Sequence, residues 1–224
     1  MAIDNKKNDA LNGAPLSLKD RVKKNPVISA IVGAIVLIAV IFLCVHLYGK
    51  YEATQNEEAA TKLAKGQQYF GMGQFDQALN GDNAGYQGLL KIASQYSGTE
   101  TGNLANLYAG LAYFYKADYD NAIKFLEKFD PKDDSMISNN AIAALGNCYA
   151  KKGNLDKAVS LLKKAAKRAS NPVISPYCLI QAGEILESQG NKDEALKLYK
   201  EVQEKYPSSG EAQTIQKYID RVSM

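Results

Sequence analysis

The sequence is poor in the residues that most catalytic and metal sites need. Its 224 residues include one histidine, three cysteines and no tryptophan. With His46 alone, the chain lacks the histidines for a His-based catalytic triad or for a metal site with several histidines. Three cysteines are too few for a disulfide framework in a chain of this length. Arginine is also scarce, at Arg21, Arg168 and Arg221, which argues against a nucleic-acid-binding face, because such faces rely on arginine to hold phosphate.

Motifs for phosphate, metal or nucleophile chemistry are missing as well. The sequence contains no glycine-rich phosphate loop and no HExxH, GxSxG or CxxC pattern. Asp133 and Asp134 follow Pro131 and could suggest a cation site, but a calcium site needs six or more oxygen ligands, so we interpret them as an exposed loop. We therefore expect a protein that is not an enzyme, with no catalytic residue, cofactor, metal, nucleic acid or small-molecule substrate.

Charge is unevenly distributed along the chain. Residues 1–26 hold six Lys and Arg against three Asp, whereas residues 50–224 hold 21 basic and 21 acidic residues. The balanced charge, with 46% hydrophobic residues, excludes a disordered chain. We expect a short basic tail and a folded, neutral C-terminal domain.

A long apolar run separates these two parts. Val27 to Tyr48 has no charged residue over 22 positions, and a helix of that length covers about 33 Å, enough for a hydrocarbon core of about 30 Å. Pro26 precedes it, where a helix start tolerates proline, and Tyr48 and Tyr51 fall where interfacial aromatics are common. A cleaved signal peptide is disfavoured because the run is too long and no Ala-x-Ala site follows. A buried core helix is disfavoured because every face is apolar.

The residues that flank this run predict its orientation. Lys19, Arg21, Lys23 and Lys24 lie on the N-terminal side, whereas acidic residues dominate the other side, at Glu52, Glu57 and Glu58 against Lys50. The positive-inside rule then places the N-terminus in the cytoplasm. We predict a single-pass protein of a bacterial inner membrane, with residues 27–48 in the lipid bilayer and the large domain in the periplasm. We interpret His46 as an interfacial residue of the span.

Three stretches of the remaining chain align without gaps over twenty positions. They are NLANLYAGLAYFYKADYDNA, NNAIAALGNCYAKKGNLDKA and PYCLIQAGEILESQGNKDEA, which begin at residues 103, 139 and 176. Each has glycine at the eighth position, tyrosine or leucine at the eleventh and alanine at the twentieth: Gly110, Gly146, Gly183, Tyr113, Tyr149, Leu186, Ala122, Ala158 and Ala195. Apolar residues at helical spacing surround these small residues, which predicts pairs of closely crossing helices.

This pattern resembles the tetratricopeptide repeat family, in which each repeat is a helix pair. The resemblance implies an all-α helical-hairpin solenoid. Short polar turns separate the paired helices, at Ala117-Asp118, Gly153-Asn154 and Gly190-Asn191. Prolines end the units, at Pro131, Pro172 and Pro207. We expect Asp120, Asp156 and Asp193, two positions before each alanine, to N-cap the second helices.

An irregular first repeat begins near Ala59, with Gly66 and Tyr69 in its first helix. Its second helix can be placed through Ala78, with Asp76 as cap, or through Gly85, with Asn83 as cap. We favour Gly85, because it restores the 37-residue spacing to Ala122 and aligns residues 91–98 with residues 201–208. That choice predicts a seven-residue inserted loop around Gly73–Asp82.

The last segment, Ser209–Ser223, predicts a capping helix, which an open-ended solenoid needs. Its apolar face carries Ile215, Tyr218, Ile219 and Val222. Four parts result: a polar cytoplasmic tail (1–26), a transmembrane helix (27–48), a linker (49–58) and a repeat solenoid with its cap (59–224).

Cys148 and Cys178 lie on the first helices of neighbouring repeats and could pair in an oxidising compartment. They fall at different heights on their helices, so we expect free, buried thiols.

The family resemblance also implies that the first helices line a concave face, through the second, fifth, ninth, twelfth and thirteenth positions of each repeat. Those positions are Leu104, Leu107, Leu111, Phe114, Tyr115, Asn140, Ala143, Asn147, Ala150, Lys151, Tyr177, Ile180, Glu184, Glu187 and Ser188, with Leu63, Gln67 and Phe70 from the first repeat. Two interpretations remain open: the apolar members belong to the core, or the set forms a groove that binds polypeptide. No cluster of Lys and Arg is present to select a terminal carboxylate or phosphate.

The whole layout of tail, single span and repeat domain resembles the YfgM-like ancillary subunits of the Sec translocon. That resemblance implies a scaffold that binds translocon subunits, periplasmic chaperones or exported chains, and that assists protein export or chaperone handover. Two other hypotheses remain: an assembly scaffold of another envelope machine, and an import-type receptor that faces the cytosol. The basic flank argues against the receptor.

Overall fold

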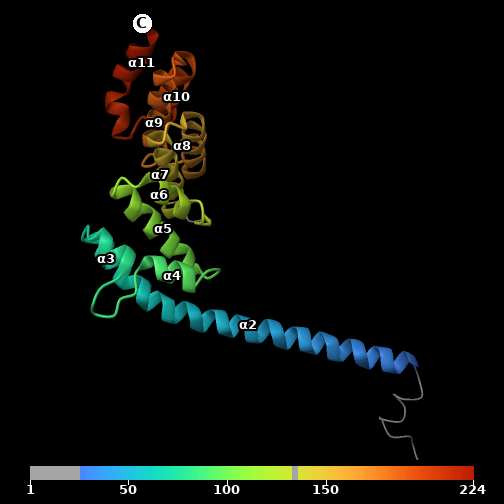
Figure 1. Cartoon of the computed structure of the whole chain (residues 1–224). Coiled ribbons are helices and arrows are strands. Elements are labelled where there is room, and N and C mark those ends of the chain that lie inside the picture. The colour runs from blue at the N-terminus through green and yellow to red at the C-terminus, as the bar shows by residue number, and fades with distance from the viewer. Residues whose placement is uncertain (1–25, 133–135) are drawn as a thin grey trace, which may run out of the picture. The chain divides into compact units, whose positions relative to one another are not determined.

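The computed structural model describes residues 26–132 and 136–224, apart from the side chains of residues 52, 53 and 55–58 (Figure 1). Within these ranges all regular structure is helical and no strand occurs, which confirms the all-α fold. The chain divides into two units, Met1–Thr54 and Gln55–Met224.

Helix α2 (Pro26–Gly71) begins at the proline that precedes the apolar run. Its portion Pro26–Tyr51 is long and apolar enough, by length and composition, to cross a membrane, and none of its most apolar window is buried in protein. The helix continues through residues 49–58, so the predicted linker is helical. Beyond the linker, Ala59 and Leu63 are buried in the second unit.

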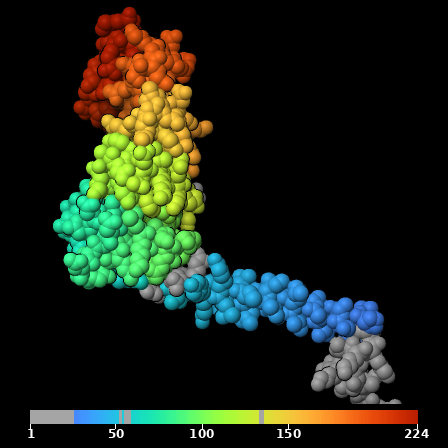
Figure 2. All heavy atoms as spheres, viewed as in Figure 1, coloured from blue at the N-terminus to red at the C-terminus, as the bar shows by residue number. Residues whose placement is uncertain are grey.

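The second unit is a series of helix pairs. Three regular pairs are α5 (Glu100–Tyr115) with α6 (Tyr119–Leu126), α7 (Ile137–Lys151) with α8 (Leu155–Ala169), and α9 (Ser175–Ser188) with α10 (Lys192–Lys205). Helix α6 also packs against α7, and α8 against α9, so that the pairs follow one another in chain order, as Figure 2 shows. This is the helical-hairpin solenoid that the repeats predict.

The glycine and alanine positions of the repeats are helix crossings. A Cβ atom added to Gly110, Gly146 or Gly183 would crowd the residue sixteen positions later on the second helix. Those three partners are Leu126, Leu162 and Tyr199. The alanines of the second helices are fully buried: Ala122, Ala158 and Ala195. The predicted close approach of the two backbones is therefore confirmed.

The predicted N-caps are wrong by two residues. Helices α6 and α8 are capped by Asp118 and Asn154, whose side chains accept hydrogen bonds from the backbone N–H groups of Asn121 (3.2 Å) and Lys157 (3.4 Å). Asn191 occupies the N-cap position of α10 without such a bond. The aspartates that the sequence favoured lie in the first turns: Asp120, Asp156 and Asp193.

Two of these first-turn aspartates link successive repeats instead. Asp120 forms an ion pair with Lys152, the C-cap residue of α7 (2.9 Å). Asp156 accepts a hydrogen bond from Gln189, the C-cap residue of α9 (2.8 Å). The same contact recurs between Asp76 and Lys116. Carboxylates near a helix N-terminus are also favourable there because of the helix dipole.

The preferred placement of the first repeat's second helix is wrong. Residues Phe75–Asn80 form helix α3, in which Ala78 is fully buried like the other repeat alanines. Gly85 lies in a turn at φ 97°. The insertion follows α3, and the second helix resumes as α4 (Leu89–Gln95). The prediction failed because the inserted residues follow the twentieth position of the repeat, Ala78. The 37-residue spacing between Gly85 and Ala122 therefore did not mark the repeat alanine.

The inserted segment is held against α2 by Asp82. Its carboxylate accepts hydrogen bonds from the backbone N–H groups of Ala84 and Tyr86 (both 2.8 Å) and from the Tyr69 hydroxyl, and it pairs with Lys65 (2.7 Å). The Tyr86 hydroxyl in turn donates to the carbonyl of Ala78 (3.0 Å). The Lys65 ammonium and the hydrogen bonds together hold the pKa of Asp82 well below its usual range. The insertion is thus an ordered part of the first repeat.

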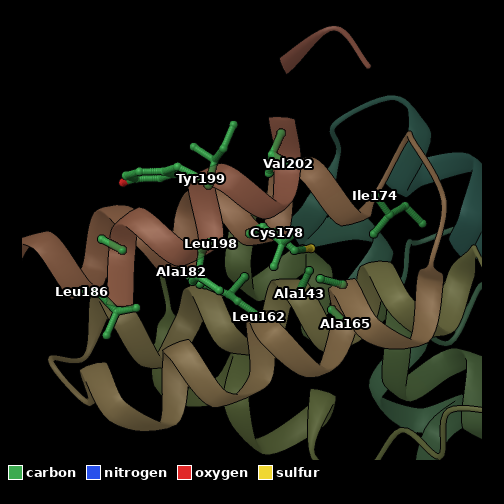
Figure 3. Packing of buried hydrophobic residues seen from close by; sticks show 14 of the residues in the cluster. Ala143, Leu162, Ala165, Ile174, Cys178, Ala182, Leu186, Leu198, Tyr199 and Val202 are labelled. Atoms are coloured by element: carbon green, nitrogen blue, oxygen red, sulfur yellow. The ribbon is translucent and has the colours of Figure 1, made fainter. Parts of the chain in front are cut away.

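The C-terminal end of the solenoid has the largest apolar core. Figure 3 shows residues of α9 and α10, among them Cys178, Ala182, Leu198 and Val202, packed together with side chains of the preceding repeat. The predicted cap consists of a 3-10 turn, η1 (Glu211–Thr214), and helix α11 (Ile215–Ser223). Three of its four predicted apolar residues are buried and Tyr218 is partly buried, so a helix with a buried apolar face stands where the cap was predicted.

Candidate functional site

A groove runs across the first helices of three successive repeats. It has a volume of about 350 Å³ and is open to solvent along its length. Its lining comes from the end of α5, the second half of α7 and most of α9: Phe114, Asn147, Ala150, Lys151, Tyr177, Gln181, Glu184, Ile185 and Ser188. The first helices therefore share one surface, as the repeat geometry requires.

Seven of the nine lining residues are among those carried over from the family pattern. Of the candidate partner-binding residues, Phe114, Asn147, Lys151, Tyr177 and Glu184 line the groove. Asn140 is exposed but lies outside it. The remaining candidates, Leu104, Leu107, Leu111, Tyr115 and Glu187, have other surroundings.

The leucines of α5 serve the core. Leu107 is buried and packs with Ala122, Leu126 and Cys148, and Leu104 and Leu111 are partly buried against the same cluster. For these positions the core interpretation holds. The first repeat behaves in the same way, because Leu63 is buried as well.

Tyr115 belongs to an aromatic cluster rather than to the groove. Its ring stacks on Phe75, with centroids 5.4 Å apart and planes at 5°, and is edge-on to Phe70 at 5.9 Å. Phe70 also packs edge-on against Tyr108 at 5.4 Å. Tyr115 nevertheless keeps 62% of its surface exposed, so the cluster presents one open aromatic face.

Glu187 is engaged within the solenoid. Its carboxylate accepts two hydrogen bonds from Arg221 of α11 and one from the hydroxyl of Tyr199. Burial opposes ionisation of Glu187, but the hydrogen bonds from Arg221 and Tyr199 outweigh it, and the pKa lies below its ordinary value. Glu187 thus stabilises the end of the stack.

Gln181 and Ile185 line the groove although they do not occupy family positions. The family pattern pointed to Ile180, which is buried in the core, and the lining residue is the next one, Gln181. A signal was present in the sequence: Tyr177, Gln181, Glu184 and Ser188 recur at intervals of four, three and four residues, which places them on one face of a helix.

The groove carries isolated charges of both signs. Lys151 and Glu184 are exposed, and neither has an ion-pair partner within the described part of the chain. The groove also offers aromatic rings from Phe114 and Tyr177 and carboxamides from Asn147 and Gln181. Such a mixed lining suits a polypeptide segment with apolar and polar side chains.

No cluster of His, Cys, Asp and Glu that could hold a metal ion occurs among the described residues. The acidic pair Asp133-Asp134 lies outside those residues. Cys148 and Cys178 are free and buried, as predicted, and burial raises the pKa of each thiol to about 12.

Comparisons with known proteins agree with this architecture. The structure is similar to a putative kinesin light chain of Podospora anserina with nearly identical TPR-like repeats, at a TM-score of 0.56 and 13% identity over 74% of this chain and 85% of that one. It is also similar to MamA (AMB-1), at a TM-score of 0.50 and 22% identity over 73% and 85% of the two chains. No curated protein matches the sequence.

A family model supplies the assignment. The model described as a tetratricopeptide repeat-like domain matches residues 25–223, which is almost the whole chain and includes the apolar portion of α2. Repeat domains of this type act as scaffolds for protein–protein interaction, and the fold is typically non-catalytic. The chain belongs to the tetratricopeptide repeat-like domain family.

Proposed function

We propose that this protein is a membrane-anchored scaffold of the bacterial periplasm whose groove binds segments of other polypeptides at the Sec translocon. In that role it assists protein export or hands chains to periplasmic chaperones. The observation that carries the proposal is the groove itself. It joins three successive repeats and offers aromatic rings, carboxamides and one charge of each sign. Extended or helical polypeptide is the ligand that combines these chemistries.

The apolar portion of α2 supports the membrane anchor. Its side chains are exposed in the structure over residues 27–48, a surface that needs lipid or another apolar partner. Six basic residues precede this portion within residues 1–26, and the domain that follows it is neutral. In our proposal residues 1–26 are a cytoplasmic tail, 27–48 cross the inner membrane and 59–224 lie in the periplasm.

Recovery of partners from native membranes tests the proposed function. The full-length protein is purified after gentle solubilisation, together with a Tyr177→Ala variant and a matched Lys200→Ala variant whose exposed side chain lies on α10 outside the groove. We expect translocon subunits or chaperones with the parent and with Lys200→Ala, and a marked loss with Tyr177→Ala. Recovery of another envelope complex instead would replace the translocon in the proposal. Equal recovery with both variants would contradict binding through the groove.

The orientation is tested separately by protease treatment of spheroplasts. A repeat domain in the periplasm is digested without lysis, because the enzyme reaches that side of the membrane directly. Protection of the repeat domain until lysis would place it in the cytosol and favour an import-type receptor.

A further inference from the structure

Two further grooves lie on the face formed by the second helices. One, of about 360 Å³, opens between α8 and α10, and the other, of about 470 Å³, opens between α6 and α8. Each has as its floor the first helix that packs between the two second helices, α9 or α7. The α8–α10 groove shares no lining residue with the groove across the first helices, so it is a separate surface.

The floor of the α8–α10 groove is apolar and recessed. Ala166, Leu179 and Leu198 line it and are each no more than 5% exposed, so they form its bottom rather than its rims. Tyr206 lines the same groove and packs against the same apolar core. Apolar groups that enter between α8 and α10 are therefore removed from water there, which favours their binding.

Lysines stand on both rims of this groove. Lys163 and Lys167 lie on α8 and Lys205 lies on α10, and all three are exposed. Glu201 is the one acidic residue of the lining, and its carboxylate is paired with Lys205 (2.9 Å). Lys163 and Lys167 form no ion pair with any described residue. They are four residues apart on one helix face, where like charges repel, so the α8 rim carries two uncompensated positive charges.

The fold accounts for only part of this charge. Lys167 lies in the last turn of α8, where the helix dipole favours a cation, but Lys163 lies a full turn earlier, where that effect has faded. Glu194 is already bound to Lys197 (2.6 Å). The hydrogen bond from Lys197, followed by the charges of Lys197 and Lys163, holds the pKa of Glu194 below its ordinary value. Lys163 and Lys167 are therefore open to an anionic group from outside the chain.

The repeat itself does not require a basic rim. In the α6–α8 groove the residue equivalent to Lys163, 36 positions earlier, is Glu127, and it pairs with Lys157 (3.0 Å). Lys164 is the one residue lining that groove whose charge has no ion-pair partner in the described part of the chain. The α8–α10 groove thus has the more positive rim, which indicates an occupant selected by charge.

We propose that the α8–α10 groove binds an acidic amphipathic helix of a partner polypeptide. The apolar side chains of that helix lie on the floor, and its carboxylates lie beside Lys163 and Lys167. An amphipathic helix has an apolar stripe with charged residues at its margins, which matches an apolar floor below a basic rim. A free carboxylate or phosphate would match the lysines and leave the floor in water. A helix also packs against α8 and α10 at once, as a lipid chain does not. This surface does not depend on the function proposed above.

The test uses the full chain in detergent micelles and a stapled helical peptide of about 16 residues, long enough for four turns. Leucines follow one face of this probe and glutamates flank them, and a matched probe has lysine in place of each glutamate. Fluorescence anisotropy measures binding. Partition of a probe into the micelle is the same for every protein variant, so differences between variants report the protein surface.

Charge reversal of the α8 rim should exchange the preference for the two probes. We expect the parent to bind the glutamate probe about tenfold more tightly than the lysine probe, and added salt to weaken that binding. The variant Lys163→Glu with Lys167→Glu should bind the glutamate probe about tenfold more weakly than the parent and should prefer the lysine probe. The control is Lys124→Glu with Lys128→Glu, which has the same spacing and charge change at exposed positions outside the three grooves. It should bind like the parent within about twofold.

Four results would overturn the proposal. Equal losses in the two double variants would show an effect of net charge alone. A glutamate probe that binds as well with serine in place of leucine would show that the apolar floor is not used. Short-chain phosphatidylglycerol that binds through Lys163 and Lys167, when the glutamate probe does not, would make the groove a lipid site. A glutamate probe that loses affinity in Tyr177→Ala and not in the α8 variant lies in the groove across the first helices.

Discussion

Glu187 on α9 and Arg221 on α11 form a bidentate pair, in which Arg221 Nε lies 2.8 Å from Oε2 and Nη2 lies 2.8 Å from Oε1. The Tyr199 hydroxyl donates to the same carboxylate from α10. Three helices thus meet at one acidic side chain that is 18% exposed. Glu187 occupies a groove position in the family pattern, but here it binds the capping helix to the last repeat.

We expect Glu187→Gln to lower the free energy of unfolding by about 1 kcal/mol, because it removes the charge that Arg221 and Tyr199 bind. The expected loss of unfolding free energy is small for a hydrogen bond to a charged group, because half of the Arg221 side chain is exposed and solvent weakens the pair. Urea unfolding of the full chain in detergent measures the loss. The matched control is Glu184→Gln, an exposed glutamate three residues away without an ion pair in the described part of the chain, which should change stability by less than about 0.5 kcal/mol. Equal losses in the two variants would contradict this role.

The same carboxylate predicts a pH dependence. Its pKa in the folded protein lies below the ordinary value of 4.5, so folding favours the ionised form. The stabilisation is fully present above about 4.5 and is lost as the pH falls through the lowered folded pKa. The stability difference between the parent and Glu187→Gln should therefore shrink between pH 7 and pH 3. A difference that stays constant over this range would show that charge is not its source.

Gly183 should not tolerate a side chain. A Cβ atom there would meet the Tyr199 ring, which is fully buried and cannot swing away. We expect Gly183→Ala to cost about 1–3 kcal/mol in unfolding free energy. Gly210→Ala is the control, since Gly210 has a φ of −60° and open space around its Cβ position. It should be neutral or slightly stabilising, and a similar loss at both sites would refute the crossing argument.

Cys148 and Cys178 should be unreactive in the folded protein. Burial raises the pKa of both thiols to about 12, so almost no thiolate is present at pH 8, and the sulfur atoms are out of reach of reagent. We expect a thiol-specific reagent to label neither residue until denaturant is added, and then to label both. Mass spectrometry of the peptides identifies the sites. A peptide that links the two cysteines by a disulfide would contradict the structure.

The repeat architecture could be predicted from sequence because its signals are periodic and physical. Glycine and alanine recur where two helices cross, and Gly110, Gly146 and Gly183 stand where any side chain would crowd the second helix. The second helix of the first repeat was misplaced because the insertion lies after Ala78 rather than before it. The spacing between repeats shows that residues have been inserted, but it does not show at which position of the repeat they lie.

The groove was only partly predictable. Family positions identified Tyr177 and Glu184, but they cannot show that Glu187 is bound by Arg221, because that contact depends on where the capping helix packs. Gln181 was missed because the candidate residues were taken from fixed positions of the family pattern. The residues that share one face of helix α9 in the sequence were not considered.

Site-specific photo-crosslinking in living cells tests the central claim most directly. A photo-reactive phenylalanine derivative replaces Tyr177 in the groove or, as control, Lys200 on the outside of α10, and crosslinked partners are identified by mass spectrometry. We predict strong crosslinks to a defined set of proteins from position 177 and little from position 200. Crosslinks of equal strength from both positions, or none from the groove, would contradict a polypeptide-binding role for this surface.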